Sequence, residues 1–414
     1  MGIFLLKILE VNDEIKLRKL ERDQIMEICI LIPSFLPTIG GAEIGAYELA
    51  KQLYRKGHRI SVIAPKYKKG WRNYEKIEGI DVYRYPLLLR LPRLTELIRV
   101  LFSFLFIGNL LRKIRPDVLN MHYVVPTGFA GQFWANKLHL PTVLTLIGND
   151  VYDPYRRPSK LYYPFMKKVM RQTNFITAIS SFVKNVLLNE FDVPENKITI
   201  IPYGIEIDKF QPNVDGTDTR RKYNISDNEK LIITVQRLHP RKGVQYFIKA
   251  AREVLRKMDN VKFLVIGNGQ EQEYLIDLSN RLKLTGKVIF TGEIENSRLN
   301  KYYAAADLFA FHTIHEGLGI VLLEAIASGK PVVTTTAGGT VDVVRDGVNG
   351  LLVPPEDSNA LANAILKLLA KPGLMEETGK AGRRIAEREF NWSLIADRYL
   401  GVFELAKKSK QTTN

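Results

Sequence analysis

The sequence predicts an α/β protein with two domains, each built on a parallel sheet covered by helices. The chain has 414 residues, more than the roughly 250 at which a single hydrophobic core usually stops growing. Short apolar runs alternate with helix-length segments throughout, which is typical of repeated β-α-β units. Pro202, Gly204 and Pro212 form a turn-rich segment near the middle of the chain, and there we expect one domain to end and the next to begin.

The first half contains six predicted strands. The first is the buried apolar run over residues 26–33 (MEICILIP), which leads through a loop into a helix over residues 42–56. Residues 1–25 become charged early and lack a signal-peptide cleavage site, so we expect an N-terminal extension ahead of the first domain. The other predicted strands cover residues 59–64, 118–122, 142–147, 175–178 and 198–201.

The second half repeats the alternation and ends in a helix predicted over residues 393–407. Its predicted strands cover residues 231–236, 261–266, 288–291, 308–311, 331–335 and 350–353. Two doubly wound domains of this kind place a ligand at the carboxyl ends of their strands.

The net charge of +16 limits the classes of partner. Residues 1–210 carry 31 Lys and Arg against 20 Asp and Glu. A nucleic acid, an anionic membrane surface or a phosphorylated substrate would each match this charge. No zinc-finger spacing, helix-turn-helix or aromatic RNA-binding signature is present, so no nucleic-acid partner is expected. The lone cysteine, Cys29, lies in an apolar run, which predicts a core residue in a cytoplasmic protein.

Residues 85–115 mix apolar and basic side chains. One interpretation is an interfacial helix on an anionic membrane, which would make the protein peripheral on the inner face of the cell membrane. The other is a buried helix with a cationic outer face, and both interpretations stay open. The longest apolar run, residues 100–111, is shorter than the roughly 20 residues needed to span a bilayer.

Two carboxylates, Glu316 and Glu324, flank a Gly-Leu-Gly turn. Residues 328–331 (Ser-Gly-Lys-Pro) are helix-stop signals, so we expect Glu316 on a loop and Glu324 in the second turn of a helix. Gly317 and Gly319 leave the helix N-terminus bare, where N–H groups and the helix dipole favour an anion. A rise of 1.5 Å per residue separates the carboxylates by about 12 Å. That spacing suits a nucleotide sugar, with hydroxyls at both ends and phosphate between.

The segment over residues 311–357 resembles the glutamate-x7-glutamate signature of retaining GT-B glycosyltransferases, specifically glycosyltransferase family four. The likeness extends over most of residues 26–410. It implies the GT-B fold, with two Rossmann-like doubly wound domains facing a central cleft. The acceptor-side domain is then residues 26–204 together with the C-terminal helix of about 395–414, and the nucleotide-sugar domain is residues 205–394.

The resemblance also implies roles for particular residues. Arg237 and Lys242 follow the first strand of the second domain and would stabilise the leaving diphosphate, while Glu316 would hold the sugar. No metal is expected, because these cations and the helix N-terminus already face the diphosphate, and no cofactor is expected. The expected donor contacts are Gly40, Gly41, Gly317, Leu318, Gly319, Ile320, Val321 and Glu324, the last holding the ribose hydroxyls. The candidate cleft residues are His122, Asp150, Gly338 and Gly339.

Several positions allow more than one interpretation. Ile147 stands where many family members have a histidine that contacts the transferred sugar, so that contact is expected from the backbone, Asp150 or His122. His122 is equally well explained as a packed polar residue at a strand end. Asp342 stands where the family often has Glu, and it is expected to cap the next helix rather than to bind ligand. Residues 267–269 (Gly-Asn-Gly) lack the rest of a dinucleotide fingerprint and are expected to be structural.

The predicted function is a retaining glycosyltransferase that moves a sugar from a UDP- or GDP-sugar to a glycan, a lipid-linked or another anionic acceptor. The alternatives are a nucleotide-sugar epimerase and a non-catalytic sugar-nucleotide sensor on the same fold. A glycosidase is disfavoured, because its two carboxyl groups lie no more than about 9.5 Å apart.

Overall fold

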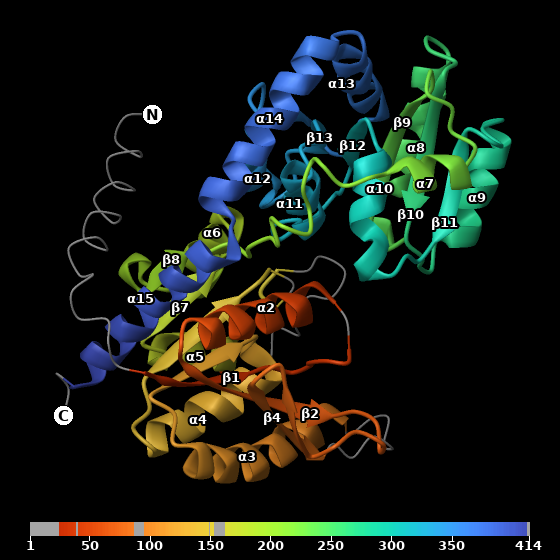
Figure 1. The fold of residues 1–414 in the computed structure, drawn as a ribbon. Helices are drawn as coiled ribbons and strands as arrows, with labels where there is room; N and C mark the ends of the chain where they lie inside the picture. The colour runs from red at the N-terminus through yellow and green to blue at the C-terminus, as the bar shows by residue number, and fades with distance from the viewer. Residues whose placement is uncertain (1–24, 39, 87–94, 149, 153–161, 412–414) are drawn as a thin grey trace.

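The computed structural model describes residues 25–38, 40–86, 95–148, 150–152 and 162–411. Two sheets, each packed between helices, form the two halves of the molecule (Figure 1). The prediction of two Rossmann-like α/β domains is therefore confirmed.

The first sheet has eight strands in the order β3-β4-β2-β1-β5-β6-β7-β8. Neighbouring strands are parallel except for the β3–β4 hairpin. That hairpin was not predicted, and its two-residue turn at Glu78 and Gly79 has positive φ at both residues, as a tight hairpin turn requires. The strands are β1 Glu27–Leu31, β2 Arg59–Lys66, β3 Tyr74–Ile77, β4 Ile80–Pro86, β5 Val118–His122, β6 Thr142–Leu146, β7 Phe175–Ala178 and β8 Ile198–Ile200.

The second sheet is parallel throughout, with the order β11-β10-β9-β12-β13-β14. The chain reverses its direction of travel across this sheet between β9 and β12, and such a reversal point is where open α/β sheets bind ligands. The strands are β9 Lys230–Val235, β10 Val261–Ile266, β11 Val288–Gly292, β12 Leu308–Phe311, β13 Val332–Thr335 and β14 Gly350–Val353.

Helices cover the sheets and join their strands. Those of the first half are α2 Gly41–Arg55, α3 Thr95–Ile114, α4 Phe129–Lys137, α5 Tyr163–Gln172 and α6 Ser181–Phe191. Those of the second half are α7 Thr217–Lys222, α8 Val244–Leu255, α9 Gln272–Arg281, α10 Leu299–Ala305, α11 Ile320–Ala327, α12 Thr340–Val343, α13 Ser358–Leu369 and α14 Pro372–Glu389.

The last helix, α15 (Trp392–Gln411), returns to the first half and packs against α2, β5 and β6 (Figure 1). Lys56 donates a 3.1 Å hydrogen bond to the Ser393 hydroxyl and forms a 3.1 Å ion pair with Asp397. The Trp392 ring lies against Gly204, where an added Cβ would come within 2.6 Å of the ring. The return of α15 therefore requires glycine at the crossing, whereas the domain boundary at residue 204 stays a prediction.

The prediction that Cys29 is a core residue is confirmed: it is fully buried in β1, and burial raises the pKa of its thiol. The interpretation of residues 85–115 as one helix is wrong at its start, because Tyr85 and Pro86 end strand β4. Residues 87–94 lie outside the described residues, and α3 follows them. None of the helices in the described part of the chain is both long and apolar enough to cross a bilayer.

Candidate active site

The Gly-Leu-Gly turn opens helix α11 as predicted. Gly319 precedes the helix with φ +89°, a conformation that glycine adopts without the penalty of a side chain. Leu322 and Leu323 are fully buried and fix the helix to the core. Glu316 lies on the preceding loop and Glu324 in the second turn, so the predicted positions of both carboxylates are confirmed.

The Glu324 carboxylate is buried beside the hydroxyl of Tyr303. Glu324 is only 8% exposed, and Tyr303, on α10, donates a 2.7 Å hydrogen bond to its Oε2 atom. Burial raises the pKa of Glu324 to about 7, against the lowering effects of the Tyr303 bond and the nearby charge of Lys209. No pattern along the chain pointed to Tyr303, because the contact depends on the packing of α10 against α11.

Lys242 and Glu316 form an ion pair in front of α11. Lys242 ends a short 3-10 turn, Pro240–Lys242, that follows β9. Glu316 also accepts a 3.1 Å hydrogen bond from the N–H of Gly317. Arg237 is exposed, and no described residue forms an ion pair with it. One predicted catalytic cation is thus paired with the predicted sugar-binding carboxylate, and the other is open to solvent.

Gly338 and Gly339 support the backbone of the Glu316 loop. Gly338 has φ +61°, and a Cβ there would lie 2.0 Å from the carbonyl oxygen of Glu316. The N–H of Gly339 donates a 3.0 Å hydrogen bond to that oxygen, and a Cβ on Gly339 would lie 2.0 Å from the oxygen of Gly317. Both glycines therefore lie against the backbone of Glu316 and Gly317, where the Gly-Leu-Gly turn begins.

Replacing Gly338 with Ala is expected to lower nucleotide binding by about tenfold or more and to destabilise the protein, because the new methyl group displaces the Glu316 carbonyl. Gly347→Ala is a matched control: its φ of +71° imposes similar backbone strain, but a Cβ there meets nothing within 4 Å. Calorimetric binding and thermal unfolding of both variants test this. Equal losses in the two would show that strain alone, and not the contact with Glu316, is responsible.

The first half of the chain also reaches the start of α11. A Cβ on Gly41 would lie 3.2 Å from the Cδ1 atom of Ile320. A Cβ on Gly317 would lie 2.3 Å from the backbone oxygen of Ile147, and one on Gly148 would lie 3.2 Å from the Cα of Gly317. The backbone oxygen of Ile147 thus lies directly against the Gly-Leu-Gly turn.

The N-terminal glycine pair is divided between two positions. Gly40 is the extended residue before α2, and a Cβ there would approach the carboxylate of Glu43 in the first turn. Gly41 is the first residue of α2 and faces Ile320. Gly40 therefore belongs to the start of helix α2, and Gly41 lies where the first half of the chain closely approaches the second.

Asp150 lies just beyond strand β6, and one of its two carboxylate oxygens accepts hydrogen bonds. Its Oδ1 atom accepts hydrogen bonds from the N–H groups of Ile147 and Gly148, at 3.3 and 2.9 Å. Its Oδ2 atom is buried and has no hydrogen-bond partner among the described residues. Burial raises the pKa of Asp150 to about 6. A hydroxyl of a bound molecule would satisfy the second oxygen.

His122 is a packed residue in the structure. It is 1% exposed, its Nε2 atom lies 3.0 Å from the Asn120 Oδ1 atom, and burial lowers its pKa to about 3. A neutral, enclosed ring of this kind fits the interpretation of His122 as a packed polar residue at a strand end.

The prediction that Asp342 caps the next helix is wrong. Asp342 lies within α12, and its carboxylate accepts hydrogen bonds from the N–H and hydroxyl of Ser181 at the start of α6, the latter at 2.6 Å. The helix it caps belongs to the other half of the chain, so this contact joins the two halves. Residues this distant in sequence carry no local capping signal.

The Gly267–Gly269 turn closes the end of β10. Gly267 has φ +125°, and Cβ atoms on Gly267 and Gly269 would lie 2.1 and 2.2 Å from the carbonyl oxygens of Gln236 and Leu238. Close backbone packing therefore explains why both positions are glycine, which agrees with the structural role expected for them. Across the described residues, no group of three or more His, Cys, Asp or Glu side chains is arranged to hold a metal ion.

Two family models match the chain. The model described as Glycosyltransferase Family 4 matches residues 39–209, and the model described as Glycosyl transferases group 1 matches residues 215–385. An uncharacterized glycosyltransferase of Methanocaldococcus jannaschii is 28% identical over 388 residues, which cover 92% of this chain and 98% of the relative. The GDP-mannose-dependent alpha-(1-6)-phosphatidylinositol monomannoside mannosyltransferase of Mycolicibacterium smegmatis is 27% identical over 390 residues, covering 91% and 98%.

Solved structures share the fold at lower identity. Sucrose-phosphate synthase from Thermosynechococcus elongatus superposes with a TM-score of 0.78 at 22% identity, covering 93% of this chain and all of that one (100%). HepE from Anabaena, in complex with UDP, superposes with a TM-score of 0.75 at 22% identity, covering 92% and 100%. Family models on both halves and the common fold agree, so the chain belongs to glycosyltransferase family 4 and has the GT-B fold.

Proposed function

We propose that this protein is a retaining glycosyltransferase that uses a nucleoside-diphosphate sugar and a lipid-linked, glycan or other anionic acceptor. The observation that carries the proposal is the arrangement around α11. A buried carboxylate, Glu324, lies within the helix, and the Lys242–Glu316 ion pair lies before its N-terminus. A carboxylate that can accept hydrogen bonds from hydroxyls, a helix N-terminus with free N–H groups and a cation thus follow one another over the length of a nucleotide sugar.

Glu324 would accept hydrogen bonds from the ribose hydroxyls. Tyr303 donates to its Oε2 atom, which leaves the lone pairs of Oε1 for the ligand. The first N–H groups of a helix have no intrahelical acceptor, so those at the start of α11, residues 319–321, are available to the diphosphate. Leu318 is 2% exposed and would contribute through its backbone. These roles require Glu324 to be ionised.

Lys242 and Arg237 would neutralise the charge that builds on the leaving diphosphate as the bond to the anomeric carbon breaks. Fixed charges directed at developing charge usually contribute most to such catalysis. Without a donor Lys242 is paired with Glu316. When a donor phosphate pairs with Lys242 instead, the Glu316 carboxylate becomes available to accept hydrogen bonds from the sugar hydroxyls. The cations and the helix N-terminus perform the task a metal would perform, so we propose metal-independent transfer.

The first half of the chain would bind the acceptor. Its Asp150 offers an unpartnered buried oxygen at the carboxyl end of β6, close to the Gly148–Gly317 contact. We propose that Asp150 orients an acceptor hydroxyl or the transferred sugar. Ile147 cannot supply this contact through its side chain, whereas many family members have a histidine at that position. Two relatives support a lipid-linked acceptor, because their names contain lipids: one is a phosphatidylinositol monomannoside mannosyltransferase, and the 27% identical protein of Streptococcus pneumoniae is an alpha-monoglucosyldiacylglycerol synthase.

Incubation with UDP-, GDP- and ADP-sugars and a set of diacylglycerol and phosphatidylinositol acceptors tests the reaction. Release of nucleoside diphosphate together with an NMR-resolved product of the donor's own anomeric configuration is expected for one nucleotide series. A product of inverted configuration would exclude the retaining mechanism. An isomerised free nucleotide sugar would favour the epimerase instead, and nucleotide binding without turnover of any donor would favour the sensor.

A further inference from the structure

An aromatic cluster lies on the surface of the first half, over helices α3, α4 and α5. Phe104 of α3 contacts Phe129 and Phe133 of α4, with ring centroids 5.8 and 5.0 Å apart. Phe129 in turn contacts Phe165 of α5 at 5.8 Å. The outer members are well exposed: Phe133 is 40%, Phe165 49% and the adjacent Leu105 65% exposed. The four rings form one continuous apolar strip across three helices, and Leu105 follows Phe104 on α3.

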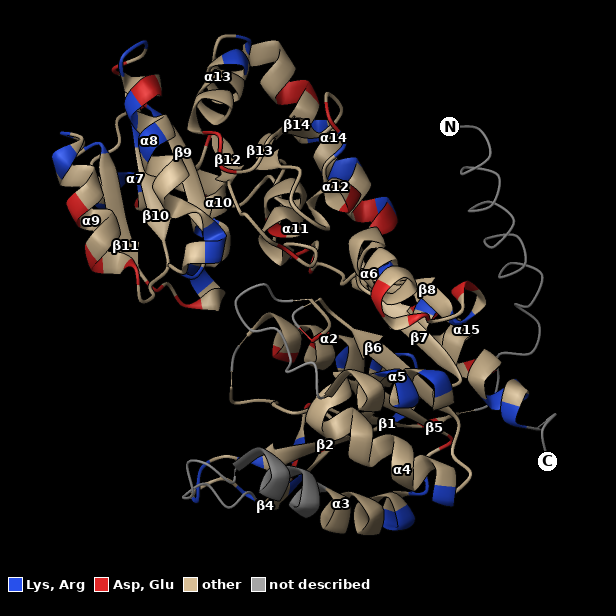
Figure 2. Cartoon of the chain, turned by 180° about the vertical axis from the view of Figure 1, so that it is seen from behind, with Lys and Arg blue, Asp and Glu red and all other residues tan. Residues whose placement is uncertain are grey.

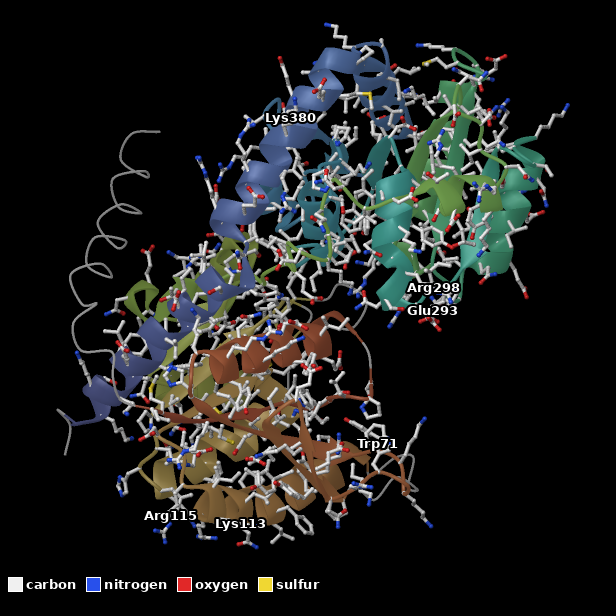
Figure 3. All side chains as sticks on the ribbon, viewed as in Figure 1. Trp71, Lys113, Arg115, Glu293, Arg298 and Lys380 are labelled. Atoms are coloured by element: carbon white, nitrogen blue, oxygen red, sulfur yellow. The ribbon has the colours of Figure 1, made fainter. Side chains whose placement is uncertain are left out.

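Cations surround this strip. Arg112 lies 4.5 Å over the ring centroid of Trp134, and Lys137 lies 4.8 Å over that of Phe133. Arg115, just after α3, points away from the domain (Figure 3), and Lys113 lies 5.4 Å over the ring centroid of Tyr83 in β4. Among the described side chains of the three helices, the basic ones are Arg112, Lys113, Lys137, Lys167, Lys168 and Arg171.

Among the described side chains, few carboxylates accompany the cations of this surface. The described side chains of α3, α4 and α5 include no Asp or Glu, and the blue of Lys and Arg marks all three helices in Figure 2. Of the six cations named above, Lys167 has a carboxylate partner, Asp192, at 2.6 Å. An open hollow of about 710 Å³ lies beside α5 and is lined by Tyr163, Pro164, Lys167, Lys168, Arg171 and Gln172.

We infer that the α3-α4-α5 surface docks on an anionic lipid bilayer. Helices that lie in a membrane interface bury Trp, Phe and Leu side chains at the boundary between headgroups and acyl chains, and each nearby Lys or Arg is attracted to anionic lipid. The strip would insert between headgroups while the surrounding cations bind phosphates, one of them in the hollow beside α5. This goes beyond the proposed reaction, which needs no membrane if the acceptor is soluble.

The combination of exposed apolar side chains and cations favours an anionic lipid surface over another polyanion as the partner. A nucleic acid or acidic polysaccharide would use the cations but would leave the Leu105 and Phe165 side chains exposed to water. Bases stack on aromatic faces, whereas the rings here contact one another edge to face, with interplanar angles of 62° to 76°. A bilayer uses both the apolar strip and the charge.

Flotation of the full chain with vesicles tests the proposal, with phosphatidylcholine alone compared with phosphatidylcholine containing phosphatidylglycerol. No donor is present, so the result is independent of the transferase proposal. Binding to the anionic vesicles alone is expected, and it should weaken as the salt concentration rises.

The double variant Lys168→Gln, Arg171→Gln should bind the anionic vesicles about 30-fold more weakly, because it loses the attraction of two cations to an anionic surface. Phe165→Ser should weaken that binding about fivefold, from loss of a half-exposed aromatic ring.

Matched controls lie in the second half. Lys257→Gln with Lys301→Gln removes the same charge from exposed positions, and Tyr274→Ser removes an aromatic residue that is also 49% exposed. Both should leave vesicle binding unchanged. The proposal is overturned if the wild type does not float with anionic vesicles at low salt, or if the controls weaken binding as much as the patch variants. It is also overturned if an RNA oligonucleotide binds the patch while Phe165→Ser has no effect on vesicle binding.

Discussion

Replacing Lys242 with Gln is expected to lower turnover of the nucleotide sugar by about 100- to 1,000-fold, the usual effect of removing one group that stabilises transition-state charge. Gln keeps most of the side-chain volume but cannot neutralise the leaving diphosphate. The variant also leaves Glu316 without its cation. We expect the loss mainly in kcat, because the charge on the leaving group grows as the glycosidic bond breaks. Release of nucleoside diphosphate over time, at several donor concentrations, measures kcat and KM separately.

Lys249→Gln is the matched control for this variant, since Lys249 is exposed on the next helix, α8. It should turn over at the wild-type rate. If Lys242→Gln kept kcat within about threefold of wild type and raised KM alone, the lysine would bind ground state and transition state equally. The catalytic role assigned to it would then be wrong.

Replacing Glu324 with Gln is expected to stabilise the protein at pH 8 while abolishing nucleotide binding. The folded-state pKa of Glu324 is about 7, raised from its ordinary value of 4.5. Stability from this group is therefore fully present below about pH 4.5 and is lost as the pH rises through about 7. A shift of that size corresponds to about 3 kcal/mol. Gln cannot ionise, so the variant avoids this cost at pH 8 and gains little at pH 4.5.

Thermal unfolding of wild type and Glu324→Gln at pH 5 and pH 8 measures the effect, with Glu377→Gln on the exposed face of α14 as the control. The midpoint of Glu324→Gln should rise by several degrees at pH 8, and the control should not change. A lower midpoint than wild type at pH 8 would mean that the ionised carboxylate stabilises the fold, and that Glu324 is a structural residue.

Much of this architecture could be predicted because it depends on local sequence. The apolar run of β1 and the glycine and proline residues after α11 define elements over a few residues, and the structure places those elements as expected. The β3–β4 hairpin was missed because both of its strands mix apolar with charged side chains. The turn at Glu78-Gly79 was the available signal.

Contacts between distant residues could not be predicted in this way. Tyr303 reaches Glu324 because α10 packs against α11, and Asp342 reaches Ser181 because the two halves meet there. Neither pairing has a periodicity or a spacing in the chain. The His122 ring was ambiguous for the same reason, since a strand-end histidine faces a cleft or the interior according to the packing of its neighbours.

The most direct test of α11 as the donor site is calorimetric titration of UDP, GDP and ADP into the wild type and Glu324→Ala, in buffer containing EDTA. We expect one nucleotide to bind the wild type without metal, with affinity falling below about pH 7 as Glu324 becomes protonated. We expect no detectable binding to Glu324→Ala. Equal affinity of both proteins for the same nucleotide would contradict the assignment of α11 as the donor site.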